Sequence, residues 1–296
     1  MSMTGLWVPL VTPMDDGRID HDSLRRLVTH LLDHGVDGFV PCGSTGEAAS
    51  LTLEEQSSVV ATVAELTDRI VAGVVATGTD EVLRDVGAMA DSGAEGALVL
   101  TPTLLGASQP EIADHYATIA TRATVPIYIY NFPARTGGGI TAASTLALSL
   151  HPGIAGTKQS ISALDLDFLV TVAGAPADFD VLIGNAALLW PALAIGAKGG
   201  VLAAAQIEPA LLTDIVEAAR DGDFERGTSL HRRAIDRVRH EGAAAIKARL
   251  LEAGLIRSAE VRSPLRQTEQ HTRSTADDPS FRFVSADINP ARSNNS

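Results

Sequence analysis

The sequence has few of the features that mark an exported, membrane-bound or nucleic-acid-binding protein. Cys42 is its one cysteine, which excludes an internal disulfide and fits a reducing compartment. No run of about 18 apolar residues is present, so no transmembrane helix is expected. Acidic residues outnumber basic ones, 36 to 23, and the formal net charge of -13 argues against sequence-independent binding to nucleic acid or to an anionic membrane.

Targeting and metal-binding patterns are also lacking. The N-terminus has no basic region followed by a long apolar run, so we expect no signal peptide and a cytoplasmic location. The histidines are scattered. His30 and His34 share a helix face, but they lie in an expected outer helix, where we interpret them as structural residues. We therefore expect no metal.

What is present is an alternation of short apolar runs and longer amphipathic ones, in a chain whose 45% hydrophobic content suits a sizeable core. The expected strands are 6–11, 38–41, 70–73, 96–100, 127–130, 154–158, 181–183 and 199–203. The expected helices are 21–34, 53–66, 81–92, 110–122, 142–150, 163–173, 187–195 and 208–219. Eight strand–helix units favour an α/β fold, the (β/α)8 TIM barrel. An open, doubly wound sheet is the alternative, because periodicity alone does not show that a sheet closes.

Local signals mark several helix ends. Thr52 precedes an expected helix and is followed three residues later by Glu55, which is the pattern of a capping box. Gly35, Gly93 and Gly196 stand where helix C-termini need a residue in the left-handed conformation.

The chain divides into three parts. Residues 1–220 form the expected catalytic barrel. The strand signal then stops, and residues 221–265 are expected to form a helical extension, with helices over 224–239 and 243–253 that contribute to subunit contacts. Residues 266–296 are polar, and we expect a flexible tail or one that contacts a neighbouring subunit.

Lysine is rare, and one lysine has an unusual position. Besides Lys198 and Lys247, the chain has Lys158, at the end of the apolar run 154–158. An ammonium at the end of such a strand is costly to desolvate unless it has a task. Burial lowers a lysine pKa, and a neutral amine attacks carbonyls. We therefore predict that Lys158 forms a Schiff base with a keto acid; the alternative is a barrel-mouth lysine paired with a carboxylate.

A glycine-rich segment follows the second expected strand. Residues 43–47 read Gly-Ser-Thr-Gly-Glu. The glycines allow a tight turn in which backbone N–H groups converge, and Ser44 and Thr45 add hydroxyl donors, which suits a small carboxylate. The alternative is a capped turn with Glu47 near a helix N-terminus. Cys42 precedes this turn and is interpreted as buried and inert.

Another polar segment follows the fifth expected strand, at the barrel end where such enzymes have their active sites. Tyr130 can transfer protons while a carbinolamine becomes an imine. Arg135 has the fork geometry that suits a second carboxylate. The alternatives are an aromatic lid and a surface arginine.

Three motifs in order, 43–47, 130–133 (Tyr-Asn-Phe-Pro) and 156–158 (Gly-Thr-Lys), resemble the dihydrodipicolinate synthase/N-acetylneuraminate lyase family of class I, pyruvate-dependent aldolases. The similarity runs from residue 6 to about residue 265. It implies a TIM barrel, a homo-oligomer (tetramer or dimer), and an imine with the substrate in place of any cofactor.

The resemblance also implies residue roles. Lys158 would be the Schiff-base lysine and Tyr130 the proton-transfer residue. The implied substrate-binding residues are Ser44, Thr45, Arg135, Gly184 and Leu202. Of these, the two hydroxyl residues would hold the pyruvate carboxylate and relay a proton, the arginine would bind a carboxylate of the aldehyde, and the last two would line the pyruvate pocket.

The sequence departs from the synthase branch at two places. That branch carries a tyrosine pair after the Thr-Pro that ends strand four, whereas here the second position is Leu104. A proton relay must then end at Ser44 or Thr45, or run through water. Gln159 also replaces the acidic residue that often follows the lysine, and this is nearer to the neuraminate lyase pattern.

The expected function is a lyase or aldolase, similar to 4-hydroxy-tetrahydrodipicolinate synthase, that adds pyruvate to an aldehyde bearing a carboxylate or releases pyruvate. Within the same chemistry, the alternatives are a 2-keto-3-deoxy-sugar-acid or N-acetylneuraminate-type aldolase and a related keto-acid dehydratase. An alternative of a different class is a non-catalytic keto-acid-binding barrel.

Overall fold

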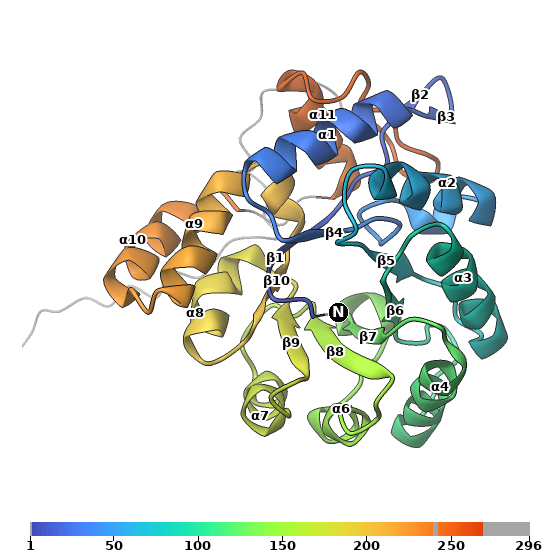
Figure 1. Cartoon of the computed structure of the whole chain (residues 1–296), viewed down its shortest axis with the longest axis vertical. Coiled ribbons are helices and arrows are strands. Elements are labelled where there is room, and N and C mark those ends of the chain that lie inside the picture. Colours follow the sequence, from blue (N-terminus) through green and yellow to red (C-terminus); the bar gives the residue numbers. More distant parts are fainter. Residues whose placement is uncertain (1, 239–241, 269–296) are drawn as a thin grey trace, which may run out of the picture.

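The computed structural model of the chain describes residues 2–238 and 242–268. Its main feature is a ring of eight parallel strands (Figure 1). These are β1 (Gly5–Pro9), β4 (Gly38–Val40), β5 (Val71–Val74), β6 (Gly96–Leu100), β7 (Ile127–Asn131), β8 (Ile154–Gln159), β9 (Asp180–Ile183) and β10 (Gly199–Val201). Their hydrogen-bonded order is β4-β1-β10-β9-β8-β7-β6-β5.

The ring closes between β4 and β5. There the Phe39 N–H donates to the Arg69 carbonyl at 2.9 Å, and the Gly73 N–H donates to the Pro41 carbonyl at 2.8 Å. Closure leaves no strand edge unpaired in the ring. The predicted (β/α)8 barrel is confirmed, and the open sheet is wrong.

Helices surround the barrel on the outside (Figure 1). They are α1 (His21–Asp33), α2 (Leu53–Ala64), α3 (Thr79–Asp91), α4 (Gln109–Arg122), α6 (Ala142–Leu148), α7 (Leu166–Gly174), α8 (Leu189–Ala194) and α9 (Pro209–Arg220). Two more follow, α10 (Phe224–Ala234) beside α9 and α11 (Ala243–Glu252) beside α1 (Figure 1). None of the helices in the described part of the chain has the length and apolar character needed to cross a membrane.

Some predicted bounds change. The helix expected over 224–239 ends at Ala234, and residue 239 lies outside the described residues. Most of the predicted tail, 269–296, lies outside them as well. The elements that were not predicted are the hairpin of β2 (Met14–Asp15) and β3 (Arg18–Ile19), the short α5 (Pro133–Thr136), and the 3-10 turns η1 (Ala48–Ser50), η2 (Ala186–Leu188) and η3 (Ala203–Gln206).

The predicted helix-end signals are confirmed. Thr52 and Glu55 form a capping box: the threonine hydroxyl accepts from the Glu55 N–H at 3.2 Å, and the glutamate carboxylate accepts from the Thr52 N–H at 2.9 Å. Gly35, Gly93 and Gly196 have φ values of 76°, 108° and 108°. A side chain at these positions would strain the backbone, which is why glycine ends these helices.

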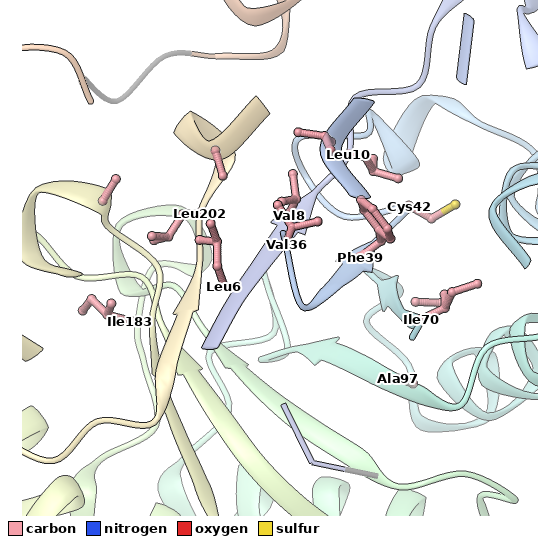
Figure 2. Close-up of a cluster of buried hydrophobic side chains, with 14 of the residues drawn as sticks. Leu6, Val8, Leu10, Val36, Phe39, Cys42, Ile70, Ala97, Ile183 and Leu202 are labelled. Atoms are coloured by element: carbon pink, nitrogen blue, oxygen red, sulfur yellow. The ribbon is translucent and has the colours of Figure 1, made fainter. Parts of the chain in front are cut away.

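Two apolar layers form the core, one inside the barrel and one between barrel and helices. Along β1, Leu6 and Val8 belong to the layer between the strands and the helices (Figure 2). Trp7, which lies between them in the sequence, belongs to the cluster inside the barrel. The barrel interior is filled by Met3, Trp7, Val40, Val71, Leu98, Tyr128, Tyr130, Leu182 and Val201. Because both faces of each strand are covered, the strands read as continuous apolar runs in the sequence.

A glycine pair tests how tightly the barrel is packed. A Cβ at Gly38 would lie 2.6 Å from a ring carbon of Trp7, whereas a Cβ at Gly87 in α3 would meet nothing within 4 Å. We expect Gly38→Ala to lower the free energy of unfolding by about 1–3 kcal/mol. The matched Gly87→Ala should raise it by about 0.5–1 kcal/mol, because alanine favours the helix. Urea unfolding of both variants measures this, and equal effects would contradict the packing described.

Candidate active site

Lys158 and Tyr130 lie side by side at the C-terminal end of the barrel. They are direct partners in the parallel ladder of β7 and β8, so both side chains leave the sheet on the same face. The Lys158 Nζ lies 4.2 Å from the centroid of the Tyr130 ring. Both side chains are buried, at 6% and 5% exposure. The structure thus brings together the two residues predicted to form the imine and to transfer its protons.

Lys158 differs from the other two lysines in its partners. Lys198 lies 3.3 Å from the buried carboxylate of Asp180, and Lys247 lies 2.5 Å from that of Glu47. Within residues 2–238 and 242–268, no carboxylate forms an ion pair with Lys158. Among the described residues, Lys158 is therefore not the carboxylate-paired lysine of the alternative interpretation.

Ser44 brings a hydroxyl to the same place from the loop after β4. Residues 43–48 form a compact turn, in which the Gly46 and Ala48 N–H groups donate to the Gly43 carbonyl at 3.0 and 3.3 Å. The Ser44 Oγ lies 3.3 Å from the Tyr130 hydroxyl oxygen. Of the two hydroxyl residues considered for the proton relay, Ser44 therefore has the contact; Thr45 is half-buried beside it, and its role stays a prediction.

Cys42 precedes this turn and faces away from the site. Its side chain is fully buried, and its Sγ contacts the Gln56 carbonyl oxygen at 3.5 Å. Burial raises the pKa of the Cys42 thiol to about 12, so the reactive thiolate is scarce at neutral pH. The prediction of a buried cysteine is confirmed.

The environment of Tyr130 lowers the pKa of its phenol. Burial acts to raise the pKa of the phenol. The Lys158 ammonium and hydrogen bonds with Ser44, Ser160 and Lys158 act in the opposite direction and outweigh it, so the pKa lies below its ordinary value of 10.0. A phenol of this kind gives up and regains a proton more readily near neutral pH.

Ser160 is a site residue that the sequence analysis missed. It follows β8 directly, two residues after Lys158, and its hydroxyl is one of the neighbours that lower the pKa of the Tyr130 phenol. Gly184, after β9, leaves the space that this arrangement needs. A Cβ there would lie 2.2 Å from the Ser160 Oγ and 3.1 Å from the Lys158 Cε. The available sequence signal was the position of Ser160 just beyond a strand-end lysine.

Arg135 lies at the rim of the site on α5. Its guanidinium carbon is 5.5 Å from the Phe132 ring centroid, and that ring stacks on Tyr130 at 5.8 Å and 27°. The side chain is exposed, and it makes no ion pair with any of the described residues. It is therefore available to an anionic ligand, although it does not contact Lys158.

Leu202 lies apart from this group. Its side chain is fully buried in the layer between the strands and the helices, together with Leu6 (Figure 2). The preceding residue, Val201, is the one that faces the barrel interior. Any contact of Leu202 with a substrate must therefore come from its backbone, and its predicted role in the pocket stays a prediction.

Gln159, the departure beside the lysine, lies behind the site. Its side-chain oxygen accepts from the Asn131 amide at 2.7 Å, and its own amide donates to the Thr157 hydroxyl at 3.0 Å. Gln159 and Asn131 are both buried and are partners in the β7–β8 ladder. An amide can donate and accept at once, so Gln159 ties the two strands together and does not face the barrel interior.

Comparisons with known proteins agree with one another. The model of the dihydrodipicolinate synthetase family matches residues 2–278. The 4-hydroxy-tetrahydrodipicolinate synthase of Methanospirillum hungatei is 36% identical over 233 residues, which span 77% of this chain and 80% of that protein. The solved dihydrodipicolinate synthase of Aquifex aeolicus has a TM-score of 0.84 and 29% identity, covering 90% of this chain and 93% of its own. That of Acinetobacter baumannii, solved with pyruvate, has a TM-score of 0.86 and 27% identity, covering 91% and 94%.

The three tyrosines of the chain should titrate in two groups. Burial raises the pKa of Tyr116 and, helped by the Asp180 carboxylate, that of Tyr128, whereas the pKa of Tyr130 is lowered from 10.0. We expect an alkaline titration of phenolate absorbance to show one tyrosine ionising below pH 10 and two well above it. Tyr130→Phe should remove the first phase. Ser44→Ala should move it to higher pH, because a hydrogen bond that lowers this pKa is lost. A first phase that survives in Tyr130→Phe would contradict this assignment.

Proposed function

The chain belongs to the dihydrodipicolinate synthetase family, and from that premise we propose that it forms an imine with pyruvate at Lys158. The resemblance drawn from three sequence motifs is confirmed, and so is the assignment to an enzyme family that makes or breaks carbon–carbon bonds. The observation that carries the proposal is the setting of Lys158. It is buried, faces the Tyr130 ring, and makes no ion pair with the described carboxylates.

The proposed chemistry starts at the Lys158 amine. The amine attacks the C2 carbonyl of pyruvate, and the resulting carbinolamine loses water to give an iminium ion. The positive charge accepts electrons when a proton leaves C3, which yields an enamine. The enamine carbon attacks the aldehyde carbonyl, which re-forms the iminium, and the new alkoxide takes up a proton. Water then hydrolyses the iminium bond to Lys158, which releases the keto-acid product and the free amine. No metal is needed, because the iminium itself is the electron sink.

Tyr130 is the proposed proton carrier for these steps. The carbinolamine oxygen must be protonated before it leaves as water, and the phenol beside Lys158 is within reach. Leu104 provides no hydroxyl for a longer relay. Its side chain is 98% exposed in this chain. We infer that the relay runs from Tyr130 to the hydroxyl of Ser44, 3.3 Å from the phenol oxygen, with the Ser160 hydroxyl as a second neighbour that lowers the pKa of the phenol.

Two anion-binding elements support an aldehyde that bears a carboxylate. The turn of residues 43–48 presents the hydroxyls of Ser44 and Thr45 for the carboxylate of pyruvate. Arg135 is an exposed guanidinium, free of ion pairs in the described part of the chain, within a protein of net charge -13. Such an arginine suits a second carboxylate. The second candidate is a 2-keto-3-deoxy-sugar-acid aldolase. It is favoured by Leu104, because the synthase branch has a tyrosine at this position.

We further propose a homo-oligomer. Leu104 and Leu105 are 98% and 67% exposed, and adjacent exposed leucines are better buried against a second copy of the chain. The cytoplasmic location and the lack of a cofactor stay predictions.

Trapping with borohydride tests the imine. Wild-type protein incubated with pyruvate and sodium borohydride should gain the mass of one reduced pyruvate, and peptide mapping should place it on Lys158. Lys158→Ala should gain nothing, while Lys198 and Lys247 should stay unmodified in both proteins. No adduct, or an adduct on another lysine, would contradict the proposal. Unchanged pyruvate affinity in Lys158→Ala would favour the non-catalytic binding barrel.

Arg135→Ala tests the second carboxylate site. With aspartate semialdehyde as the test aldehyde that bears a carboxylate, we expect KM to rise about tenfold, which corresponds to the loss of roughly one hydrogen bond to a charged group. Trapping of pyruvate should be unchanged, because Arg135 does not contact Lys158. Arg122→Ala is the matched control, since Arg122 is a similarly exposed arginine that pairs with Asp80 on the surface. Equal KM values in both variants would rule out this role for Arg135.

A further inference from the structure

Lys247, in α11, is fully buried although the proposed mechanism does not use it. Its ammonium donates to the Glu260 carbonyl at 2.6 Å and lies 2.5 Å from the Glu47 Oε1. Burial lowers the pKa of Lys247, and the Glu47 carboxylate opposes this effect. Removing a charged group from water costs free energy, and at Lys247 that cost is offset by the Glu47 carboxylate. The role of Lys247 therefore depends on what Glu47 does.

Glu47 is the last residue of the glycine-rich motif that carries Ser44 and Thr45. It is 5% exposed and has a left-handed φ of 58°, which a glutamate adopts only when its surroundings hold it there. Its second carboxylate oxygen accepts from the Arg262 backbone N–H at 2.9 Å. Both oxygens are thus held by the segment that follows the barrel.

The Arg262 side chain holds the stretch that comes after the turn. Its guanidinium forms two hydrogen bonds of 2.6 Å with the carboxylate of Glu55, at the start of α2, and donates to the Ser50 carbonyl at 2.9 Å. The loop between β4 and α2 is therefore fixed at Glu47, Ser50 and Glu55 by residues more than 190 positions later in the chain.

A short path links this fixed end of the loop to the reacting groups. The Glu47 N–H donates to the Ser44 carbonyl at 3.3 Å, which makes the two residues parts of one turn. The Ser44 Oγ is 3.3 Å from the Tyr130 phenol, which lies beside Lys158. The ion pair thus acts on a rigid turn whose other end carries a site hydroxyl.

We propose that Lys247 and Arg262 are positioning residues of the active site: they clamp Glu47 and so hold Ser44 and Thr45 where the keto-acid carboxylate binds. This inference rests on the proposed function. Replacing a buried ion pair by apolar groups is often neutral or stabilising, so stability alone does not explain why the pair is there. The need to hold the turn of residues 43–48 in place does explain the pair. The C-terminal helix α11, which carries Lys247, then has a part in substrate binding.

The test uses three variants. Lys247→Met leaves a buried carboxylate unpaired, whereas the double variant Glu47→Gln/Lys247→Met removes both charges. Lys198→Met is the matched control, because Lys198 also pairs with a buried carboxylate, that of Asp180. The readouts are KM and kcat for pyruvate, the alkaline titration of Tyr130, and the urea midpoint.

Both Lys247 variants should raise KM for pyruvate about tenfold with a smaller change in kcat, which corresponds to about one hydrogen bond to a charged group. In both, the first tyrosine phase should move to higher pH, because Ser44 no longer holds the phenol. The double variant should regain much of the urea midpoint that Lys247→Met loses, yet keep the raised KM. Lys198→Met should lose stability while KM and the titration stay at wild-type values.

Two results would overturn the inference. One is wild-type KM and wild-type Tyr130 titration in the folded double variant. The other is a KM that recovers together with the urea midpoint, which would mean that the pair only stabilises the fold. The proposed function fails separately, through the absence of a trapped adduct in wild-type protein. The Tyr130 titration needs no substrate, so it decides the positioning role in that case too.

Discussion

The register between β7 and β8 is the constraint on which the site depends. In that register Tyr130 faces Lys158, and a slip of one residue would turn one of the two side chains toward the helices. Two features fix it. The Asn131–Gln159 bond ties the strands together at 2.7 Å. Gly156 is the ladder partner of Tyr128, and a Cβ there would lie 3.0 Å from the Tyr128 ring on β7 and 2.4 Å from the Asp180 carbonyl oxygen on β9, so a slip that brought another residue to this place would clash.

Two buried charged residues inside the barrel, Asp180 and Lys158, have different kinds of partner. At the N-terminal end of β9, the buried Asp180 accepts hydrogen bonds from Ser2 and from the Met3 N–H at 2.7 Å, and pairs with Lys198. At the C-terminal end, Lys158 has neutral hydroxyls and an aromatic ring around it. The Asp180 carboxylate is thus occupied by structural contacts, whereas Lys158 is left for chemistry at the end of the barrel where this fold has its active sites.

Much of this architecture could be predicted from the sequence, because strands, helix caps and glycine-rich turns are local patterns. The side-chain environment could not. Ser160 gains its role only because the chain folds its hydroxyl onto a neighbouring strand. Lys247 reads as an ordinary residue of an amphipathic helix until Glu47, 200 positions earlier, is seen beside it. The side-chain direction of Leu202, just after β10, was likewise not visible in the sequence: it belongs to the outer layer, and its predicted part in the pocket stays a prediction. The helix expected over 224–239 shows the same limit, because a periodic pattern does not say where packing stops.

The most direct test of the account is a crystal structure of the protein soaked with pyruvate. We expect continuous electron density from the Lys158 Nζ to the C2 atom of pyruvate, and the pyruvate carboxylate against the turn at Ser44. The Tyr130 hydroxyl should lie within hydrogen-bond distance of the position that the C2 oxygen occupied before it left as water. Pyruvate bound elsewhere, or resting in the barrel mouth with the Lys158 nitrogen unbonded, would contradict it.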